Sequence, residues 1–362
     1  MSNLNPYFIG SNRYIGCNYV RLLLPFHELG WDGTHLSMSK DSRKSPKQVS
    51  EEIPYYNPIA FHRPNKVKHH KLALSFKNAG KKIVFDNDDT FHFNKEHPMF
   101  SLYDDKEKLL TYIKETNDLL HNFITNADLV TTTTETLANE YKLYNDNVHI
   151  LPNCINPDDW DKPLRNEGDK IRLGVIGSTA YAHDYTHIKE QIKELDKTGK
   201  FTIVVFGLQS KKDREINKLV TNLFQKEYGF WLELDNVEHI PWCAIEDYPR
   251  ILNEARLDMA IIPRSENYFN KCKSNVKFLE LAMCEVPVIA QSFEHGPYEE
   301  ITDDMGILIK DNDNWFNSVT KLAENRSERL RLGSNAHQYA LDNYNIKDNA
   351  YKWEEVYKSI LT

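Results

Sequence analysis

Short apolar segments alternate with stretches of helical periodicity along the whole chain. Each apolar segment has about the length of one β-strand, and helical patterns such as residues 18–29, 65–79 and 106–126 separate them. Strands that alternate with helices predict parallel sheets covered by helices, which is the α/β class. In the first half of the chain the predicted strands are residues 7–9, 34–38, 58–61, 82–86, 129–133 and 149–152.

The alternation stops between residues 152 and 168, where Pro, Asn and Asp are frequent. This composition indicates an interdomain linker, so we predict one domain over residues 1–165 and a second over residues 166–345. Two α/β halves joined in this way form a cleft, and ligands bind there beyond the carboxyl ends of the strands. The predicted strands of the second half are residues 171–177, 201–206, 237–240, 257–262, 286–290 and 306–309.

The segment from Lys273 to Glu280 lies at the predicted start of a helix in the second half. Lys273 and Ser274 fall where the first N–H groups of that helix and its positive dipole end converge, which is a ready site for phosphate. Glu280 lies nearly two turns further along, within reach of a sugar hydroxyl. The segment predicts a nucleoside diphosphate site. Two other interpretations stay open: Ser274 as a simple helix cap and Glu280 as an exposed helix residue.

Other candidates for the same ligand surround this segment in sequence. Gly177, Ser178 and Thr179 follow the first strand of the second half, where a glycine lets the backbone approach a phosphate or a sugar. Lys277 and Arg264 could add positive charge at a leaving diphosphate, or each could be a solvated surface residue.

Four consecutive polar residues, Asp86, Asn87, Asp88 and Asp89, end an apolar strand of the first half and should face the cleft. Carboxylates in a cluster can bind a metal ion, and they can also form a mere polar turn. We favour acceptor orientation or proton removal by Asp88 or Asp89, with His92 as a weaker alternative base.

The composition indicates the class of protein and the compartment in which we expect it. The chain has 362 residues, of which 40% are hydrophobic and 27% charged, as in globular proteins. Its five cysteines show no C-x-x-C spacing, which argues against a zinc site or a disulfide framework. No apolar run reaches the length of a membrane helix, and the first residues lack the features of a signal peptide. We therefore expect a cytoplasmic location, in a bacterium or a phage-infected host.

Charge is uneven along the chain. The net charge is -8, yet basic residues dominate from Lys40 to Lys82, a segment that we call the basic zone. Such a zone attracts polyanions such as double-stranded DNA or an anionic membrane surface, and it can also be solvated surface. Within its helical part, Leu72, Phe76 and Ala79 form an apolar stripe that is better explained by packing on a sheet than by lipid.

Several of these blocks resemble one enzyme family. Gly177-Ser178-Thr179 with His183-Asp184, the stretch 248–252, and Lys273–Glu280 running into residues 282–290 resemble the donor domain of retaining glycosyltransferases with two Rossmann-like domains, the GT-B fold. The likeness is to the large family that includes sucrose and glycogen synthase relatives, also called family 4 or group 1. Residues 19–25, 63–64 and 83–89 resemble one branch of it.

The resemblance implies a nucleotide-sugar site. The sequence departs from the family pattern at one position. The family has two Glu residues separated by seven others; Glu280 fills the second place, but Cys272 stands in the first. The branch with Lys-Ser-Asn-x-Lys-x-x-Glu often lacks that first Glu. The implied donor-binding residues are Gly177, Ser178, Thr179, Arg264, Lys273, Ser274, Asn275, Val276, Lys277 and Glu280.

The resemblance also implies contacts from the first domain. It places the loop before Asn18 in the cleft, so that Asn18, Tyr19 and Arg21 are acceptor-binding candidates together with Arg63 and His92. Arg21 and Arg63 could equally form structural ion pairs. The catalytic candidates are Asp88, Asp89 and Lys273. The resemblance further implies that no metal ion is needed and that the final helix, residues 346–362, crosses back to the first domain.

The expected activity is transfer of a sugar from a nucleotide sugar, with UDP as the favoured nucleotide, to a hydroxyl group with retention of the anomeric configuration. We favour hydroxymethylated bases of DNA as the acceptor, as in phage DNA-modifying enzymes, because of the basic zone. A cell-surface polysaccharide or lipid-linked glycan is the alternative acceptor. A non-catalytic sugar-nucleotide-binding protein stays open, whereas the lack of G-x-G-x-x-G after a strand argues against a nicotinamide oxidoreductase.

Overall fold

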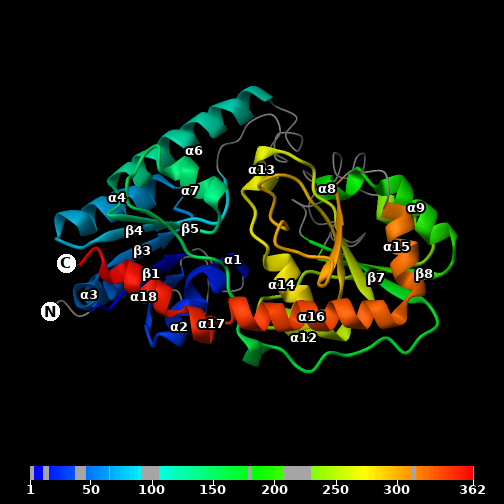
Figure 1. Ribbon diagram of the computed structural model, residues 1–362. Helices are drawn as coiled ribbons and strands as arrows, with labels where there is room; N and C mark the ends of the chain where they lie inside the picture. Colours follow the sequence, from blue (N-terminus) through cyan, green and yellow to red (C-terminus); the bar gives the residue numbers. More distant parts are fainter. Residues whose placement is uncertain are drawn as a thin grey trace.

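The computed structural model describes residues 4–10, 16–36, 46–64, 66–90, 106–177, 182–207, 230–310 and 315–361. It contains two parallel sheets, one in each half of the chain, with helices on both faces of each (Figure 1). The predicted α/β class with two Rossmann-like domains is therefore confirmed. No described helix is both long enough and apolar enough to cross a membrane.

The first sheet has the strand order β2-β1-β3-β4-β5-β6. The central strands β3, β4 and β5 are buried at every position, as expected for parallel strands that helices cover on both sides. Since the order of the strands reverses at β1, a crevice forms where β1 and β3 end. The bounds are Tyr7–Gly10 for β1, Gly33–Leu36 for β2, Ile59–His62 for β3, Ile83–Asp86 for β4, Leu129–Thr132 for β5 and Val148–Ile150 for β6.

Two layers of helices enclose the first sheet. One face carries α3 (Pro46–Glu52), α4 (Val67–Asn78), α6 (Lys106–Asn126) and α7 (Glu135–Tyr141), whose apolar side chains share a core with the strands. Leu72 and Phe76 of α4 pack against this core, which confirms the packing interpretation of the apolar stripe. The other face carries a continuous helical segment made of α1 (Gly16–Asn18), a π-helical turn (Tyr19–Leu23) and α2 (Leu24–Glu28).

The second sheet has the strand order β12-β11-β10-β7-β8-β9, which is the order of a Rossmann sheet. The order reverses between β7 and β10, so this domain should bind its ligand where those two strands end. The bounds are Ile171–Ile176 for β7, Phe201–Phe206 for β8, Val237–Ile240 for β9, Met259–Ile262 for β10, Val288–Gln291 for β11 and Gly306–Ile309 for β12.

The helices of the second domain also form two layers. One core includes side chains of α9 (Lys189–Lys197) and α15 (Trp315–Glu324), and the other includes side chains of α12 (Tyr248–Glu254), α14 (Val276–Met283) and α16 (Arg326–Tyr344). Short helices complete this half of the described chain: α8 (Ala182–Thr186), a 3-10 turn at Phe230–Glu233, and α13 (Tyr268–Lys271).

The chain crosses between the domains twice, and the two crossings lie side by side. The linker residue Ile155 donates its N–H to the carbonyl of Tyr344 at 2.9 Å and accepts from the N–H of Ile346 at 2.8 Å. Beyond this point α17 (Ile346–Asn349) and α18 (Tyr351–Lys358) return to the first domain, as expected (Figure 1). Trp353 and Tyr357 are fully buried there, in the same core as Phe8.

Candidate functional site

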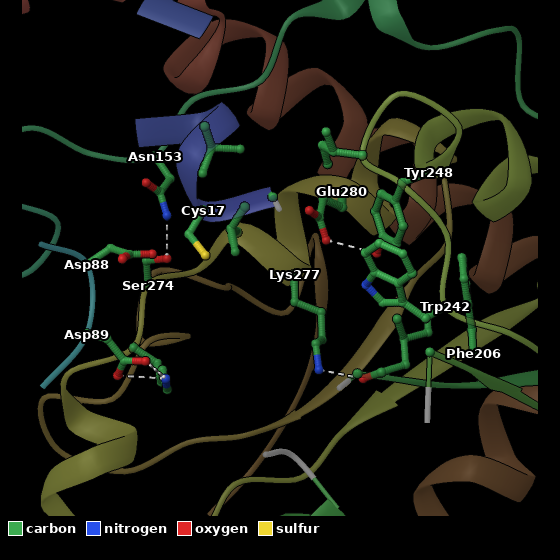
Figure 2. A pocket seen from close by; sticks show the side chains of 18 of the residues that line it. Cys17, Asp88, Asp89, Asn153, Phe206, Trp242, Tyr248, Ser274, Lys277 and Glu280 are labelled. Atoms are coloured by element: carbon green, nitrogen blue, oxygen red, sulfur yellow. Dashed lines mark hydrogen bonds and ion pairs between the residues drawn. The ribbon is translucent and has the colours of Figure 1, made fainter. Parts of the chain in front are cut away.

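A cavity of about 380 Å³, which we call the central cavity, lies between the carboxyl ends of the two sheets (Figure 2). Both switch points of strand order open onto it, because Arg63 follows β3, and Gly177 and Arg264 follow β7 and β10. The predicted site residues that line it are Arg63, Asp88, Asp89, Gly177, Arg264, Lys273, Ser274, Val276, Lys277 and Glu280.

The remaining predicted residues lie elsewhere. Asn18 and Arg21 are buried and do not line the central cavity. Tyr19 lines a neighbouring cavity, where its hydroxyl donates to a carboxylate oxygen of Asp159. Asn275 lines a second cavity on the far side of Ser274. Ser178, Thr179 and His92 lie outside the described residues.

Helix α14 begins at the wall of the central cavity. Asn275 occupies its N-cap position without a side-chain capping bond, so the interpretation of Ser274 as the helix cap is wrong. The hydroxyl of Ser274 instead accepts a hydrogen bond from the amide of Asn153, a first-domain residue, at 2.9 Å. The first N–H groups of a helix lack intrahelical partners and carry partial positive charge, which suits a phosphate group.

Lys273, just before this helix, joins the two domains. Its ammonium group donates to both carboxylate oxygens of Asp89 at 2.8 Å and lies 3.9 Å from the centroid of the Phe269 ring. Lys273 is largely buried, with 9% of its surface exposed, so its charge is held in place rather than solvated. A diphosphate bound at the start of α14 would meet this ammonium group.

Glu280, about one turn along α14, lies on the side of the cavity away from Ser274 (Figure 2). It is half-buried and accepts a hydrogen bond from the hydroxyl of Tyr248 at 3.0 Å, so the interpretation as an exposed helix residue is wrong. Burial raises the pKa of Glu280 to about 7, although the hydrogen bond from Tyr248 and the charge of Lys277 act in the other direction. A carboxylate of this kind can accept hydrogen bonds from sugar hydroxyls.

Aromatic side chains surround Glu280. The rings of Phe206 and Tyr248 are 5.3 Å apart, and Trp242 stands beside them with 63% of its surface exposed (Figure 2). An exposed indole at a cavity rim offers a flat apolar face on which a planar base can stack. Gly207, with a φ of +78°, lets the end of β8 approach Gly177 closely, because a Cβ there would lie 2.7 Å from the Gly177 carbonyl oxygen.

Lys277 and Arg264 form the floor of the cavity and are not the solvated residues that the sequence left open. The Lys277 ammonium group donates to the carbonyl of Ile176, and burial holds the pKa of Lys277 well below its usual value. Arg264 is 4% exposed and donates to Asp184 at 2.8 Å. Asp184 also accepts from the Ser265 N–H at 3.1 Å, which fixes the turn after β10.

A buried ion-pair network occupies the first-domain wall. Asp86 is fully buried and is bound by Arg21 at 2.7 Å, His62 at 2.8 Å and Thr131 at 2.6 Å. Arg21 therefore forms the structural ion pair that the sequence left open. Burial lowers the pKa of His62, but its hydrogen bond to Asp86 and the charges of Asp88 and Asp86 outweigh this effect and raise it to about 9. The imidazole is a cation at neutral pH.

Asp88 and Asp89 lie between this network and the cavity. Arg63 donates to Asp88 at 2.6 Å and approaches Asp89 at 3.6 Å. Burial alone would raise the pKa of Asp88, but the charges of Arg63 and His62 lower it well below its ordinary value. Arg63 has a φ of +48°, a left-handed conformation that is uncommon for a residue with a side chain. No cluster of three or more potential metal ligands occurs in the described ranges.

Sequence reasoning did not name several of the lining residues as site residues, among them Cys17, Asn153, Phe206 and Trp242. Phe206 ends β8, and Trp242 and Asn153 come shortly after the ends of β9 and β6. The rule that ligands bind beyond the carboxyl ends of parallel strands could have pointed to these three. Cys17 lies on the helix that follows β1, where its residue type gave no such signal.

The second half of the chain is similar to a known protein family. No protein of curated function matches the sequence. Residues 182–355, nearly half of the chain, match a family model described as glycosyl transferase-like. The second domain is therefore similar to the glycosyl transferase-like family. The matched part contains most of the described second-domain residues that line the central cavity.

Solved structures extend the likeness to both domains. HepE of Anabaena, solved with UDP-glucose, matches with a TM-score of 0.68 at 13% identity over 99% of this chain and 100% of that chain. Sucrose-phosphate synthase of Thermosynechococcus elongatus matches with a TM-score of 0.65 at 12% identity over 99% of each chain. A mutant TarM of S. aureus matches with a TM-score of 0.57 at 14% identity. That match covers 83% of this chain but 55% of TarM, so this chain spans about half of its length.

These structures share the GT-B fold with this chain. Together, the family match over residues 182–355 and the shared fold support a glycosyltransferase of the GT-B type. At identities of 12–14% the structural likeness carries the fold alone, so the substrates must be argued from the site.

The network around Asp86 gives a prediction about stability. Asp86→Asn keeps the shape of the side chain but leaves Arg21 and His62 as buried cations without their counter-charge, which typically costs about 3–5 kcal/mol. We expect denaturant unfolding to show that loss. The control Asp118→Asn, on the exposed side of α6, should change the free energy of unfolding by less than about 0.5 kcal/mol. Equal, small effects of the two substitutions would contradict the importance of the network.

Proposed function

We propose that this glycosyltransferase moves a sugar from a UDP-sugar to a hydroxyl acceptor with retention of configuration. The observation that carries the proposal is the polarity of the central cavity. Glu280 and the aromatic group of Phe206, Trp242 and Tyr248 lie at one side, and Ser274 and Asp89 lie at the other (Figure 2). Lys273, which binds Asp89, supplies positive charge at that other side. A nucleoside diphosphate has the same polarity, with a flat base and ribose hydroxyls at one end and negative charge at the other.

Two structural neighbours support the choice of nucleotide. HepE was solved with UDP-glucose, and the TarM mutant was solved with UDP. The size of the cavity also fits, because about 380 Å³ is within the range of small-molecule sites. We assign Glu280 to the ribose, Trp242 to the base, and Lys273 with the first N–H groups of α14 to the diphosphate.

The reaction follows from this placement. An acceptor oxygen forms a bond to the anomeric carbon of the sugar while the bond from that carbon to the β-phosphate oxygen breaks. UDP leaves with the electron pair, and the acceptor proton ends on a phosphate oxygen of the leaving UDP. Negative charge therefore grows on the diphosphate in the transition state, where the Lys273 ammonium group and the helix dipole stabilise it.

The pKa values and the partners of the carboxylates in the central cavity support retention of the anomeric configuration. An inverting reaction needs a general base beside the acceptor, and Asp88 is a weak base because its pKa is held well below its ordinary value. Asp89 is bound by Lys273 through both oxygens. Glu280 has a pKa of about 7 but lies at the side that we assign to the nucleoside. In a retaining reaction the acceptor attacks from the same face as the leaving group, and UDP itself takes the proton. That reaction needs none of these three carboxylates as a general base.

We also propose that the transfer needs no added metal ion. Asp88 and Asp89, the carboxylates at the first-domain wall of the cavity, already have Arg63 and Lys273 as counter-charges. A divalent cation would have to displace those protein cations to bind them.

Hydroxymethylated DNA, the acceptor favoured from the basic zone, stays a prediction. Lys40, Arg43 and Lys44 lie outside the described residues. Further along the zone, the ammonium groups of Lys77 and Lys82 lie 3.6 Å from Asp128, and Lys81 donates to two backbone carbonyls. These three basic side chains thus have partners within the domain. These three side chains therefore support DNA less than the sequence did, and a saccharide acceptor becomes the stronger proposal. The cytoplasmic location also stays a prediction.

The assignment of Glu280 predicts a pH-dependent affinity for UDP. The ionised carboxylate accepts a ribose hydroxyl, so affinity should be full above pH 7 and fall by about tenfold between pH 8 and pH 6 as Glu280 takes up its proton. Calorimetric titration at several pH values measures this. Glu280→Gln should bind UDP about tenfold more weakly at pH 8 and lose most of the dependence, leaving only that of the phosphate.

The exposed Glu324→Gln serves as the control and should behave as the wild type. If Glu280→Gln binds UDP as tightly as the wild type at pH 8, Glu280 does not contact the nucleotide. UDP binding without turnover of any nucleotide sugar would favour the non-catalytic alternative.

The stereochemistry of the product and the metal dependence of the transfer can be measured in one experiment. Proton NMR of the product formed from an α-linked UDP-sugar should show an α-linkage. The rate should stay within about twofold after EDTA treatment, because the cations that we assign to the leaving group belong to the protein. A β-linked product would contradict retention, and activity that returns only with Mg²⁺ or Mn²⁺ would contradict metal independence.

A further inference from the structure

A second cavity, of about 370 Å³, lies beyond the phosphate side of the central cavity. Its first-domain wall is the segment from Thr133 to Thr136 and the end of β6, and its second-domain wall includes the start of α14 and the loop after β11. The two cavities share three lining residues, Asn153, Lys273 and Ser274. These three residues form the wall that we call the shared wall.

The second cavity is polar and contains a buried hydroxyl without a partner. Thr133, Thr134 and Thr136 are among its lining residues, and the Thr134 hydroxyl accepts a hydrogen bond from the N–H of Leu137. Thr133 is 7% exposed, and its Oγ1 has no hydrogen-bond partner among the described residues. Buried polar groups are nearly always paired, so an unpaired hydroxyl on a residue that lines a cavity points to a ligand that supplies the missing hydrogen bond.

The opposite wall is held rigidly. Glu300 accepts hydrogen bonds from the hydroxyls of Tyr339 at 2.9 Å and Tyr344 at 2.5 Å, and from the amide of Asn275. Asn275 is also the N-cap residue of α14. The wall of the second cavity and the start of the proposed diphosphate site are thus parts of one hydrogen-bonded unit, whose fixed geometry favours a defined ligand.

We propose that the second cavity is the acceptor site and that it binds an uncharged saccharide. This inference rests on the function proposed above. With the nucleoside at Glu280 and the diphosphate at Lys273, the anomeric carbon comes next along the donor, at the shared wall. An acceptor hydroxyl in the second cavity reaches that carbon from beyond the diphosphate, and the bond changes are those given for the transfer.

The charges around the second cavity select against a polyanion. Glu135 and Glu299 line it and are exposed, whereas the two lysines of its lining, Lys271 and Lys273, are paired with Glu266 and Asp89. The exposed carboxylates would therefore repel the phosphates of DNA or of an anionic lipid. Hydroxyl, amide and carboxylate groups together suit the many hydroxyls of a sugar, which can donate and accept.

A larger neighbouring cavity is a weaker candidate for the acceptor. It has a volume of about 920 Å³ and shares Ile245 with the central cavity. Ile245 lies between Trp242 and Tyr248 in sequence, on the side that we assign to the nucleoside. An acceptor there would be separated from the anomeric carbon by the length of the nucleotide.

The test compares acceptors and then variants. Wild-type protein is incubated with UDP-glucose, UDP-galactose or UDP-N-acetylglucosamine, alone or with maltotriose, cellotriose, chitotriose or a DNA duplex containing 5-hydroxymethylcytosine. Release of UDP and the mass of each acceptor are measured. We expect a saccharide to gain one sugar unit and the duplex to gain none. Transfer to the duplex alone, or release of UDP that no saccharide accelerates, would overturn the inference.

The variants then locate the saccharide. Thr133→Val removes the unpaired hydroxyl at nearly constant shape, so it should fold, and it should raise the KM for the saccharide at least about fivefold. Thr136→Val serves as a second cavity variant, and the exposed Thr125→Val on α6 is the control. An unchanged KM for the saccharide in both cavity variants would place the acceptor elsewhere. Failure of the donor proposal looks different: the wild type would then neither bind UDP nor release it from any nucleotide sugar.

Discussion

The ion pair between Lys273 and Asp89 is the interaction on which the account of this site depends. It joins the start of α14 in the second domain to the end of β4 in the first, and both ammonium–oxygen distances are 2.8 Å. Ser274 makes a second link across the same interface, through Asn153. The residues that we assign to the diphosphate therefore also hold the two domains together, so a bound diphosphate would compete with Asp89 for the Lys273 ammonium group. Binding of the donor and the relative position of the domains should be coupled.

The acidic residues at the end of β4 have two different roles. Asp86 faces the interior and is neutralised by Arg21 and His62, whereas Asp88 and Asp89 line the cavity. Arg63 and His62, at the end of the neighbouring strand β3, supply positive charge to both parts. Breaking the buried part should therefore disturb the cavity wall as well as the fold, since the same side chains position Asp88.

The sequence predicted the fold class well, because alternating strands and helices leave a periodic record in hydrophobicity. It also found the residues that follow buried strands, including Gly177, Arg264 and Asp88, because the carboxyl ends of parallel strands meet at one edge of a sheet. It could not decide side-chain direction. Arg21 and Arg63 both carried two interpretations, and only the packed structure shows one buried on Asp86 and the other at the cavity.

The sequence also could not predict which side chains form hydrogen bonds and ion pairs across the interface between the two domains. Asn153 and Ser274 are 121 positions apart, and Lys273 and Asp89 are 184 apart, so no local pattern relates them. Trp242 was missed for another reason: a single tryptophan after a short strand is more often a core residue than a platform at a cavity rim. Cys272, where the family pattern has Glu, is buried in the first-domain core beside Tyr268. A thiol in that position cannot offer a charged oxygen to the sugar, so the donor sugar must be held by other groups.

The most direct test of this account is the affinity of UDP for Lys273→Met, measured by calorimetry beside the wild type and the exposed control Lys321→Met. Loss of a charge-assisted contact to the diphosphate, together with the release of the Asp89 carboxylate beside it, should weaken UDP binding by about tenfold to a hundredfold. The control should bind as the wild type does. An affinity of Lys273→Met within twofold of the wild type would contradict the central claim that the start of α14 holds the diphosphate.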